Sequence, residues 1–598
     1  MPASLFVVVL VFFVMEVSCA EPFLAEGGAC QRCVLQDSSN FRSARDNKVW
    51  ELCLTPTALE GTGSNKTLLL RLRDVVGAKA TPAINISINS ASQDGKGGGG
   101  ADNHNEYEGF VHRLEVFAYV PGGNNTAKET GCSASTGLCR RKKRKAAHQT
   151  WLVSDAGTAQ EWATAINDSL DGIGLEKEER EGVREDGSVD IDTTGVGQRQ
   201  GGQGGSVQRS QRRRRRLLVL INPVSGTGGS RSMWNNTLRP MLEQAQARTT
   251  VIFSTRRGEF AEIISNAAGG GGTIASSVIE GASGAAVSRV GNLDDLDGIV
   301  VVGGDGTFFE VLQGMYARAD CAAQLKRLSL GLVPSGSGNG LAKTLSVESG
   351  EEFGAVSASF LAAKGHTKAM DLLPTESGDK KYLAFLNVGW GMISDVDIES
   401  EAYRWVGPFR FTVGTVVRIV NLKHYKGRIS YLPALDEADD AEADPAETAP
   451  RVPVPVPFRM PSLAEKLPLS EDSGEQASAE RWTSVEGEFV LADATQASHI
   501  AHDMPMAPHS RLGDGLIDLF FIKKGASRLA MIQMFLAMEK GEHISPRYPC
   551  ISWFRVRAFR IEPLTSKGRL TVDGELVDYA PLQQHVWHKA ANVFCSPE

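Results

Sequence analysis

Val302-Gly303-Gly304-Asp305-Gly306-Thr307 stands between an apolar run at residues 299–302 and a stretch with helical spacing at 308–316. The run predicts a buried strand. Glycines at its carboxyl end allow backbone N–H groups to approach phosphate oxygens, beside the positive end of the following helix. Taken alone, such a turn also fits a purely structural strand-to-helix bend. Its position therefore predicts a phosphate-binding turn in which Asp305 faces the ligand.

Two further turns of this kind follow apolar runs at 217–221 and 328–333: Asn222-Pro-Val-Ser-Gly226-Thr-Gly228-Gly229 and Pro334-Ser-Gly336-Ser337-Gly338-Asn339. A strand at 251–254 and helices at 233–247 and 260–267 lie between the runs, and this alternation predicts a parallel α/β sheet. Ligands of such sheets bind at the carboxyl ends of the strands, so three such turns favour nucleotide binding. Neither a P-loop nor a well-spaced G-x-G-x-x-G is present.

After about residue 370 short β-like runs predominate, at 382–387, 427–432, 488–492, 516–522, 551–561 and 570–572. The fold class predicted is α/β, with a nucleotide-binding domain at 217–369 and a β-rich, sandwich-like domain at 370–598. Within these, the Gly/Ala/Ser-rich segment 269–295 and the acidic, Pro-rich insert 434–480 are predicted to be disordered. The apolar stretches 411–420 and 530–538 either line a ligand tunnel or are ordinary core.

The first 216 residues have a different pattern. Runs at 49–54, 67–72, 110–119 and 150–153, followed by a helix at 158–166, predict a β-rich domain at 28–170. It resembles a pleckstrin-homology domain in ending on one helix, and an unrelated small β-rich domain is the alternative. The basic run at 140–145 would then lie in a loop able to meet anionic lipid. Residues 171–216 lack large apolar side chains and are predicted to be a disordered linker.

Composition sets further limits. The 598 residues carry a net charge of −8 with 42% hydrophobic residues, as in a globular protein of several domains and unlike a nucleic-acid binder. Cys321, Cys550 and Cys595 are predicted to be reduced thiols, and no second pair completes a zinc pattern with Cys30 and Cys33, so we predict no metal site. Residues 1–20 form an apolar segment, for which a signal peptide on one hand and a mis-called start or a membrane-touching segment on the other stay equally open.

The three turns, as Asn222-Pro223-Val224, Gly303-Gly304-Asp305-Gly306 and 334–339, look like blocks shared by diacylglycerol, ceramide and sphingosine kinases. Residues 389–401, Tyr403-Arg404 and 407–415 are similar to the sphingosine kinase segment nearly position by position. Further similarity lies at 535–543 and 572–575. The resemblance covers roughly 217–595 and identifies the chain as a suspected sphingosine kinase.

Roles for individual residues follow from this resemblance alone. It implies that Asp305 is the general base and that Asp397 pairs with the head-group amine. Residues implied on the substrate side are Gly303, Gly304, Asp305, Gly306, Asn387 and Asp397. Residues implied on the nucleotide side are Asn222, Pro223, Val224, Thr255, Glu259, Gly304, Gly306, Glu310, Gly336, Ser337, Gly338, Arg404, Arg410, Asp573, Gly574 and Glu575.

The sequence departs from the family pattern at two places. Phe260 stands where a His is expected near the adenine, and stacking on the base could survive that change. Asn387 stands where the family often has Ser near the head group, which puts discrimination among sphingoid bases in doubt. An ordinary surface helix at 399–405 would instead pair Arg404 with Glu401.

The resemblance implies an ATP- and Mg²⁺-dependent kinase that phosphorylates the primary hydroxyl of sphingosine. The alternatives are a ceramide or diacylglycerol kinase and, from another class, an inactive lipid-binding adaptor. The expected partners are a sphingoid base and a membrane surface, without nucleic acid, and the expected location is cytoplasmic and peripheral to membranes. Oligomeric state is not predicted.

Overall fold

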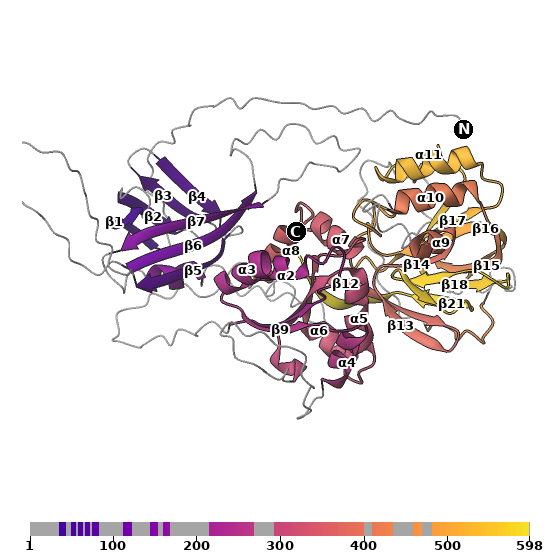
Figure 1. Cartoon of the computed structure of the whole chain (residues 1–598), viewed down its shortest axis with the longest axis horizontal. Helices are drawn as coiled ribbons and strands as arrows, with labels where there is room; N and C mark the ends of the chain where they lie inside the picture. Colours follow the sequence, from indigo (N-terminus) through magenta and orange to yellow (C-terminus); the bar gives the residue numbers. More distant parts are fainter. Residues whose placement is uncertain are drawn as a thin grey trace, which may run out of the picture.

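The computed structural model describes residues 35–43, 49–54, 58–63, 66–71, 75–82, 112–121, 144–153, 160–167, 214–267, 292–399, 410–434, 459–468 and 481–596. Figure 1 shows three parts in chain order: a β-rich unit in indigo, an α/β layer in magenta, and a β-rich layer in orange and yellow. The α/β class with a second, sandwich-like β domain is confirmed.

The N-terminal unit is an antiparallel sheet of seven strands in the order β4-β3-β2-β1-β7-β6-β5. Its strands are β1 (Leu35–Ser43), β2 (Val49–Leu54), β3 (Ala58–Gly63), β4 (Lys66–Arg71), β5 (Val75–Pro82), β6 (His112–Pro121) and β7 (Arg144–Val153). A helix over 160–167 follows and buries Trp162 and Ile166. The pleckstrin-homology resemblance stays a prediction.

The loop expected at 140–145 is wrong in part, because β7 begins at Arg144 and continues through Lys145, while 140–143 lie outside the described residues. Side-chain donors tie the unit to the next part of the chain. Gln246 Nε2 donates to the carbonyl of Ala78 at 3.2 Å, and Lys364 Nζ donates to the carbonyl of Val75 at 3.0 Å.

The α/β layer is built on parallel strands in the order β9-β8-β10-β11, with β22 alongside β11. Its elements are β8 (Arg216–Ile221), α2 (Ser230–Met233), η2 (Trp234–Leu238), α3 (Arg239–Gln244), β9 (Arg248–Phe253), α4 (Glu259–Asn266), η3 (Leu293–Asp295), β10 (Gly298–Gly303), α5 (Asp305–Tyr316), α6 (Cys321–Arg327), β11 (Ser329–Pro334), α7 (Gly340–Glu348) and α8 (Ala355–Lys364). Apolar side chains pack on both faces of the sheet, so its strands are buried as predicted.

The single helix predicted at 233–247 is divided in the structure. It starts at Ser230, widens to a π-turn over Trp234–Leu238 and ends at Gln244. Pro240 explains the widening, because proline has no N–H to donate to the preceding turn and its ring crowds the carbonyl four residues earlier.

The second domain begins on β12 (Thr367–Ser377), whose first half pairs with β22 and whose second half pairs with β13 and β21. One strand therefore belongs to both sheets. The remaining elements are β13 (Lys380–Ala384), β14 (Asn387–Gly391), α9 (Met392–Glu399), α10 (Arg410–Val420), β15 (Tyr425–Pro433), β16 (Thr483–Thr495), β17 (Ile517–Lys523), α11 (Arg528–Met538), β18 (Ile551–Pro563), β19 (Leu570–Val572), β20 (Glu575–Val577), β21 (Leu582–His585) and β22 (Trp587–Phe594).

The strand expected at 382–387 is interrupted, since β13 ends at Ala384 and β14 begins at Asn387. The carboxylate of Asp573 accepts the backbone N–H groups of Phe385, Leu386 and Asn387 at 2.8–3.0 Å. These three N–H groups are therefore not available for hydrogen bonds between strands. Tertiary contact thus overrides the local β preference.

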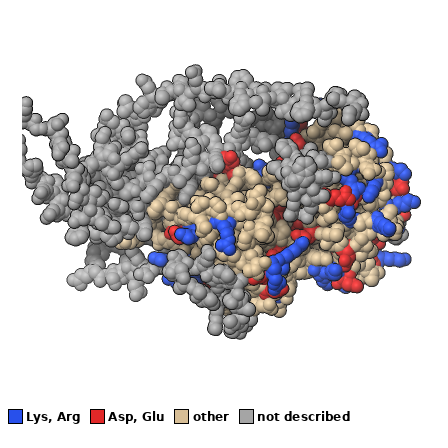
Figure 2. Space-filling view, in the orientation of Figure 1, with Lys and Arg blue, Asp and Glu red and all other residues tan. Residues whose placement is uncertain are grey.

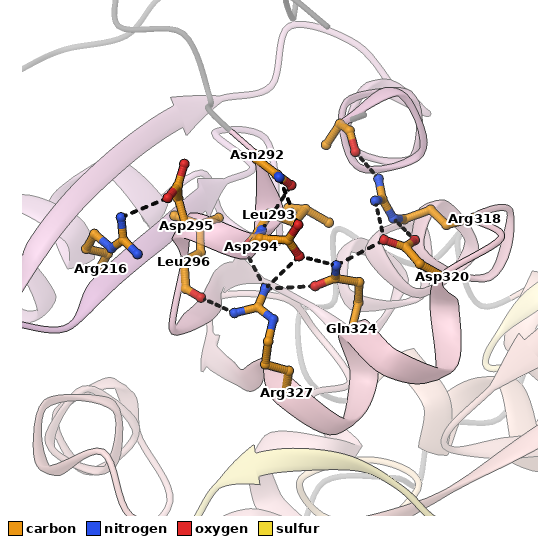
Figure 3. Close-up of polar contacts among 11 residues, drawn as sticks. Arg216, Asn292, Leu293, Asp294, Asp295, Leu296, Arg318, Asp320, Gln324 and Arg327 are labelled. Atoms are coloured by element: carbon orange, nitrogen blue, oxygen red, sulfur yellow. Dashed lines mark hydrogen bonds and ion pairs between the residues drawn. The ribbon is translucent and has the colours of Figure 1, made fainter. Parts of the chain in front are cut away.

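Both segments predicted to be disordered are partly ordered, and the first correction concerns the end of 269–295. Residues 293–295 form a short helix that Arg327 holds from α6 by donating to the carbonyls of Leu293 and Leu296 at 2.6 and 2.5 Å (Figure 3). Gln324 adds a bond to Asp294 Oδ1 at 2.7 Å. Buried Leu293 supplies the apolar anchor that the Gly-rich composition conceals.

The second correction concerns 434–480, of which 459–468 is described. Arg560 donates to the carbonyls of Ser462 and Glu465 at 2.9 Å each, while Met460 and Leu467 pack on buried Trp482. Cys321 and Cys595 are buried and Cys550 is half-buried, and none of the three forms a disulfide among the described residues. None of the described helices is both long and apolar enough to cross a membrane. Residues 1–20 lie outside the described part of the chain.

On the face seen in Figure 2, Lys and Arg are interspersed with Asp and Glu.

Candidate active site

A cavity of about 680 Å³ opens at the carboxyl ends of β8, β9, β10 and β11 and extends to α9 and β14 of the second domain. All three Gly-rich turns line it, because neighbouring parallel strands end at one edge of their sheet. Residues from both domains therefore surround a single space.

The turns touch one another through backbone. A Cβ added to Gly226, whose φ is +56°, would lie 2.1 Å from the carbonyl oxygen of Ser335, and one on Gly304 would lie 3.0 Å from Gly336 Cα. Ser335 also donates its N–H to the carbonyl of Gly303 at 2.8 Å. Only glycine permits this approach, which concentrates backbone N–H groups at the strand ends.

Asp305 is the first residue of α5 and is nine-tenths buried. Its Oδ2 accepts from Gly340 N at 2.9 Å and its Oδ1 from Leu341 N at 3.2 Å, so the N-terminus of α7 holds the carboxylate. Burial raises the pKa of Asp305, and these backbone donors oppose the shift. The side chain is thus fixed in orientation and made more basic than an exposed aspartate.

Side-chain hydrogen bonds arrange the part of the cavity where the family resemblance implies the nucleotide. Asn222 Nδ2 donates to Thr307 Oγ1 at 3.0 Å, which joins the first turn to α5. Glu259 Oε2 accepts from Thr255 N at 2.6 Å and from its Oγ1 at 2.9 Å. Glu310 accepts from Gly258 N, and burial raises the pKa of Glu310.

Asp573 has a left-handed backbone, with φ of 51°, and its carboxylate binds the three amides at 385–387 described above. Its pKa rises to about 7, first because of burial and also because of the nearby Asp305. The side chain lines the cavity, but its oxygens face the chain between β13 and β14. In this structure Asp573 therefore positions Asn387.

Asp397 lies on α9 and lines the same cavity. A Cβ on Gly574 would stand 3.5 Å from its Oδ2, so the glycine leaves space beside the carboxylate. Charged contacts hold the helix in place: Arg569 Nη1 lies 2.9 Å from Asp395 Oδ1 and 2.7 Å from Glu399 Oε1, and Arg418 also bonds to Glu399.

Most of the residues named from the sequence lie together around this cavity. Those that line it are Asn222, Pro223, Val224, Thr255, Gly304, Asp305, Gly306, Glu310, Gly336, Ser337, Gly338, Asn387, Asp397, Asp573, Gly574 and Glu575. Gly303 and Glu259 stand behind this lining and support the third turn and Thr255. Arg404 lies outside the described residues, and Arg410 opens α10 with a side chain that is not described.

Three residues were missed. Arg256 and Arg257 line the cavity, with Arg257 paired to Glu575 and Arg256 to Glu262. Their position directly after Thr255 was the available signal. Asp493 was missed because it lies within an apolar run on β16, yet its Oδ1 accepts from Asn387 Nδ2 at 2.7 Å. Among the described residues, no three His, Cys, Asp or Glu side chains are grouped so as to hold a metal ion.

The buried carboxyl of Asp493 predicts a specific pH dependence of stability. Burial raises its pKa to about 7, helped by the charge of Asp397, against about 3.9 in an unfolded chain. Between these values the folded chain retains a proton that the unfolded chain has released, so the wild type loses stability as pH rises from about 4 to 7. An Asp493→Asn variant lacks this loss. The melting temperature of the variant minus that of the wild type should therefore increase as the pH is raised from 5 to 8.

Asp578→Asn, at an exposed carboxylate, is the matched control. An Asp493→Asn difference from wild type that is equal at pH 5 and pH 8 would contradict the assignment.

The chain matches two known domain families. Residues 216–374 match the diacylglycerol kinase catalytic domain, and residues 479–595 match the YegS C-terminal NAD kinase beta sandwich-like domain. A diacylglycerol kinase structure from Bacillus anthracis str. Sterne aligns with a TM-score of 0.40 at 16% identity, covering 64% of this chain and 97% of that one.

Curated proteins are similar over most of their length. Sphingosine kinase 2 of Homo sapiens is 30% identical over 561 residues, covering 74% of this chain and 78% of that protein. Sphingosine kinase 1 of Homo sapiens is 32% identical over 379 residues, covering 62% of this chain and 88% of that protein. Together with the shared catalytic domain, these similarities show that the chain belongs to the sphingosine kinase family of lipid kinases.

Proposed function

We propose that this chain transfers the γ-phosphate of ATP to the primary hydroxyl of sphingosine or a related sphingoid base, giving the 1-phosphate. Membership in a lipid kinase family is the starting point. The observation that carries the proposal is one cavity in which three Gly-rich turns, the fixed carboxylate of Asp305 and the carboxylate of Asp397 all lie.

Asp305 acts as the general base in this proposal. A carboxylate held by two backbone N–H groups keeps one orientation, and a pKa raised by burial makes it a better proton acceptor. It orients the attacking hydroxyl and takes its proton. Phosphoryl transfer gains mostly from such positioning and from neutralising charge on the phosphates.

The glycine turns and the arginines bind the triphosphate. Backbone N–H groups suit phosphate oxygens, and Arg256 and Arg257 add positive charge beside them. Arg404 and Arg410 keep the phosphate-binding role that the family resemblance implies. Magnesium neutralises phosphate charge when bound, and we propose that it enters with ATP and takes few protein ligands.

Asp397 pairs with the ammonium group of the lipid. A carboxylate beside a glycine-lined space binds a cation more strongly than an uncharged head group, because a charge-assisted hydrogen bond is about twice as strong as a bond between neutral groups. This supports a sphingoid base over ceramide or diacylglycerol, which lack a free amine. The adaptor alternative receives less support, because Asp305 and the phosphate turns are all in place.

The lipid tail is proposed to follow α10 and α11. A small cavity of about 80 Å³ between these helices shares Thr415, Met504 and Phe535 with the main cavity. Beside it, the two helices expose large apolar side chains, between 45% and 67% accessible: Val416, Val417, Val420, Leu529 and Leu536. Such a patch fits a membrane surface, where the substrate resides, and agrees with the peripheral location in the cytoplasm that we propose.

Assays of purified protein with radiolabelled ATP against sphingosine, ceramide and diacylglycerol test the proposed reaction. Wild type should label sphingosine. Asp305→Asn should lower kcat by about 10²–10⁴-fold because the base is lost, while nucleotide binding persists. Asp397→Ala should raise the KM for sphingosine and leave the KM for ATP unchanged, and Asp578→Asn should behave as wild type.

Each alternative has its own outcome. Labelling of ceramide or diacylglycerol in place of sphingosine would assign the chain to those kinases. Folded protein that binds lipid and labels none of the three would favour the adaptor.

The membrane surface is tested by vesicle sedimentation. Val420→Glu and Leu529→Glu remove exposed apolar side chains that line neither cavity, so vesicle binding should weaken several-fold while activity on sphingosine in detergent micelles persists. Leu564→Glu, at a similarly exposed leucine outside these helices, is the control. Equal vesicle binding by all three variants would contradict this surface.

A further inference from the structure

Asn387 is held at three points beside the proposed head-group site. Its N–H donates to Asp573 Oδ1 at 3.0 Å, its carbonyl accepts from Asp573 N at 2.8 Å, and its side-chain Nδ2 donates to Asp493 Oδ1 at 2.7 Å. A planar amide directs its oxygen away from the bond made by its nitrogen. The bond to Asp493 therefore fixes the plane of the amide, and the amide oxygen is the acceptor that Asn387 can present to the cavity it lines.

Asp493 stands directly behind this amide. It lies on β16 opposite Gly389 of β14, where a Cβ on Gly389 would meet Ile393 and Ser394 of α9. The side chain is fully buried, and its Oδ2 has no hydrogen-bond partner among the described residues. A buried carboxyl with one bond is costly, and an apolar residue at this strand position would cost less. Stability alone gives no reason for an aspartate here.

We infer that Asp493 is a specificity-determining positioning residue, which locks the Asn387 amide so that its oxygen is held as a hydrogen-bond acceptor for the lipid head group. This inference rests on the proposed function. The amide oxygen of Asn387 and the carboxylate of Asp397 are then two acceptors in one cavity, which suits an ammonium group with its three donors and no acceptor.

The same lock excludes acylated lipids. An N-acyl sphingosine brings a carbonyl oxygen close to the amine position, where it would meet the amide oxygen of Asn387 and the carboxylate of Asp397, and these acceptors would stay unpaired. Without Asp493 the amide of Asn387 can rotate and offer its Nδ2 to such a carbonyl. Asp493 thus acts through Asn387, without touching the lipid itself.

The test measures kcat/KM for sphingosine and for a short-chain N-acyl sphingosine. Asp493→Ala should lower the preference for sphingosine by about tenfold, as expected for one lost hydrogen-bond constraint, with kcat for sphingosine and KM for ATP unchanged. Asp493→Asn should restore the preference, because its side-chain oxygen can still accept from Asn387 Nδ2. Asp493→Val, which fills the site with apolar atoms, serves as a second variant should Asp493→Ala not fold.

Asp518→Asn is the matched control, since Asp518 is a buried carboxylate on the neighbouring β17 that accepts from Trp553 Nε1 at 2.7 Å and does not line the cavity. A preference within twofold of wild type in Asp493→Ala or Asp493→Val overturns the inference. The inference is also overturned if the preference for sphingosine falls while the KM for ATP and the KM for lipid rise together. Wild-type protein that fails to phosphorylate sphingosine contradicts the proposed function and this inference with it, whereas active wild type with unaltered variants contradicts the inference alone.

Discussion

The close approach of glycine backbone at the ends of β8, β10 and β11 is the constraint on which the rest of the site depends. Gly226 meets the carbonyl of Ser335, and Gly304 meets Gly336, with no room for a side chain between them. Three adjacent parallel strands bring the turns together, and the same arrangement brings Asp305 to the N-terminus of α7. The phosphate site and the general base that we propose thus have one structural origin.

A second feature is the use of buried carboxylates as supports. Asp573 takes three backbone amides between β13 and β14, and Asp493 takes the side-chain amide of Asn387. Burial raises the pKa of both to about 7. Buried carboxylates cost stability, and here they fix the wall of the cavity that we assign to the lipid head group. Because β12 runs through both sheets, this wall is held in one continuous structure with the phosphate turns.

Much of this architecture could be predicted from local pattern. The runs at 217–221, 299–302 and 328–333 are buried on both faces, so their apolar continuity marked them as parallel strands. The helix break before Pro240 was missed although the proline itself was its local signal. The gap between β13 and β14 was missed because it depends on Asp573, nearly two hundred residues away. Composition misjudged 292–295 and 459–468, where single arginines supply the anchoring bonds. Asp493 could not be found because nothing local distinguishes it, and only strand pairing brings it to Asn387.

Calorimetric titration of ATP into the purified chain tests the central claim most directly, with Gly304→Ala compared against Gly487→Ala. Gly487 has open space around it, so its variant should bind as wild type does. A methyl group on Gly304 must push the second and third turns apart, so its dissociation constant for ATP should rise by about tenfold or more. Equal affinity for ATP in both folded variants would contradict the claim that the contact between these turns forms the phosphate site.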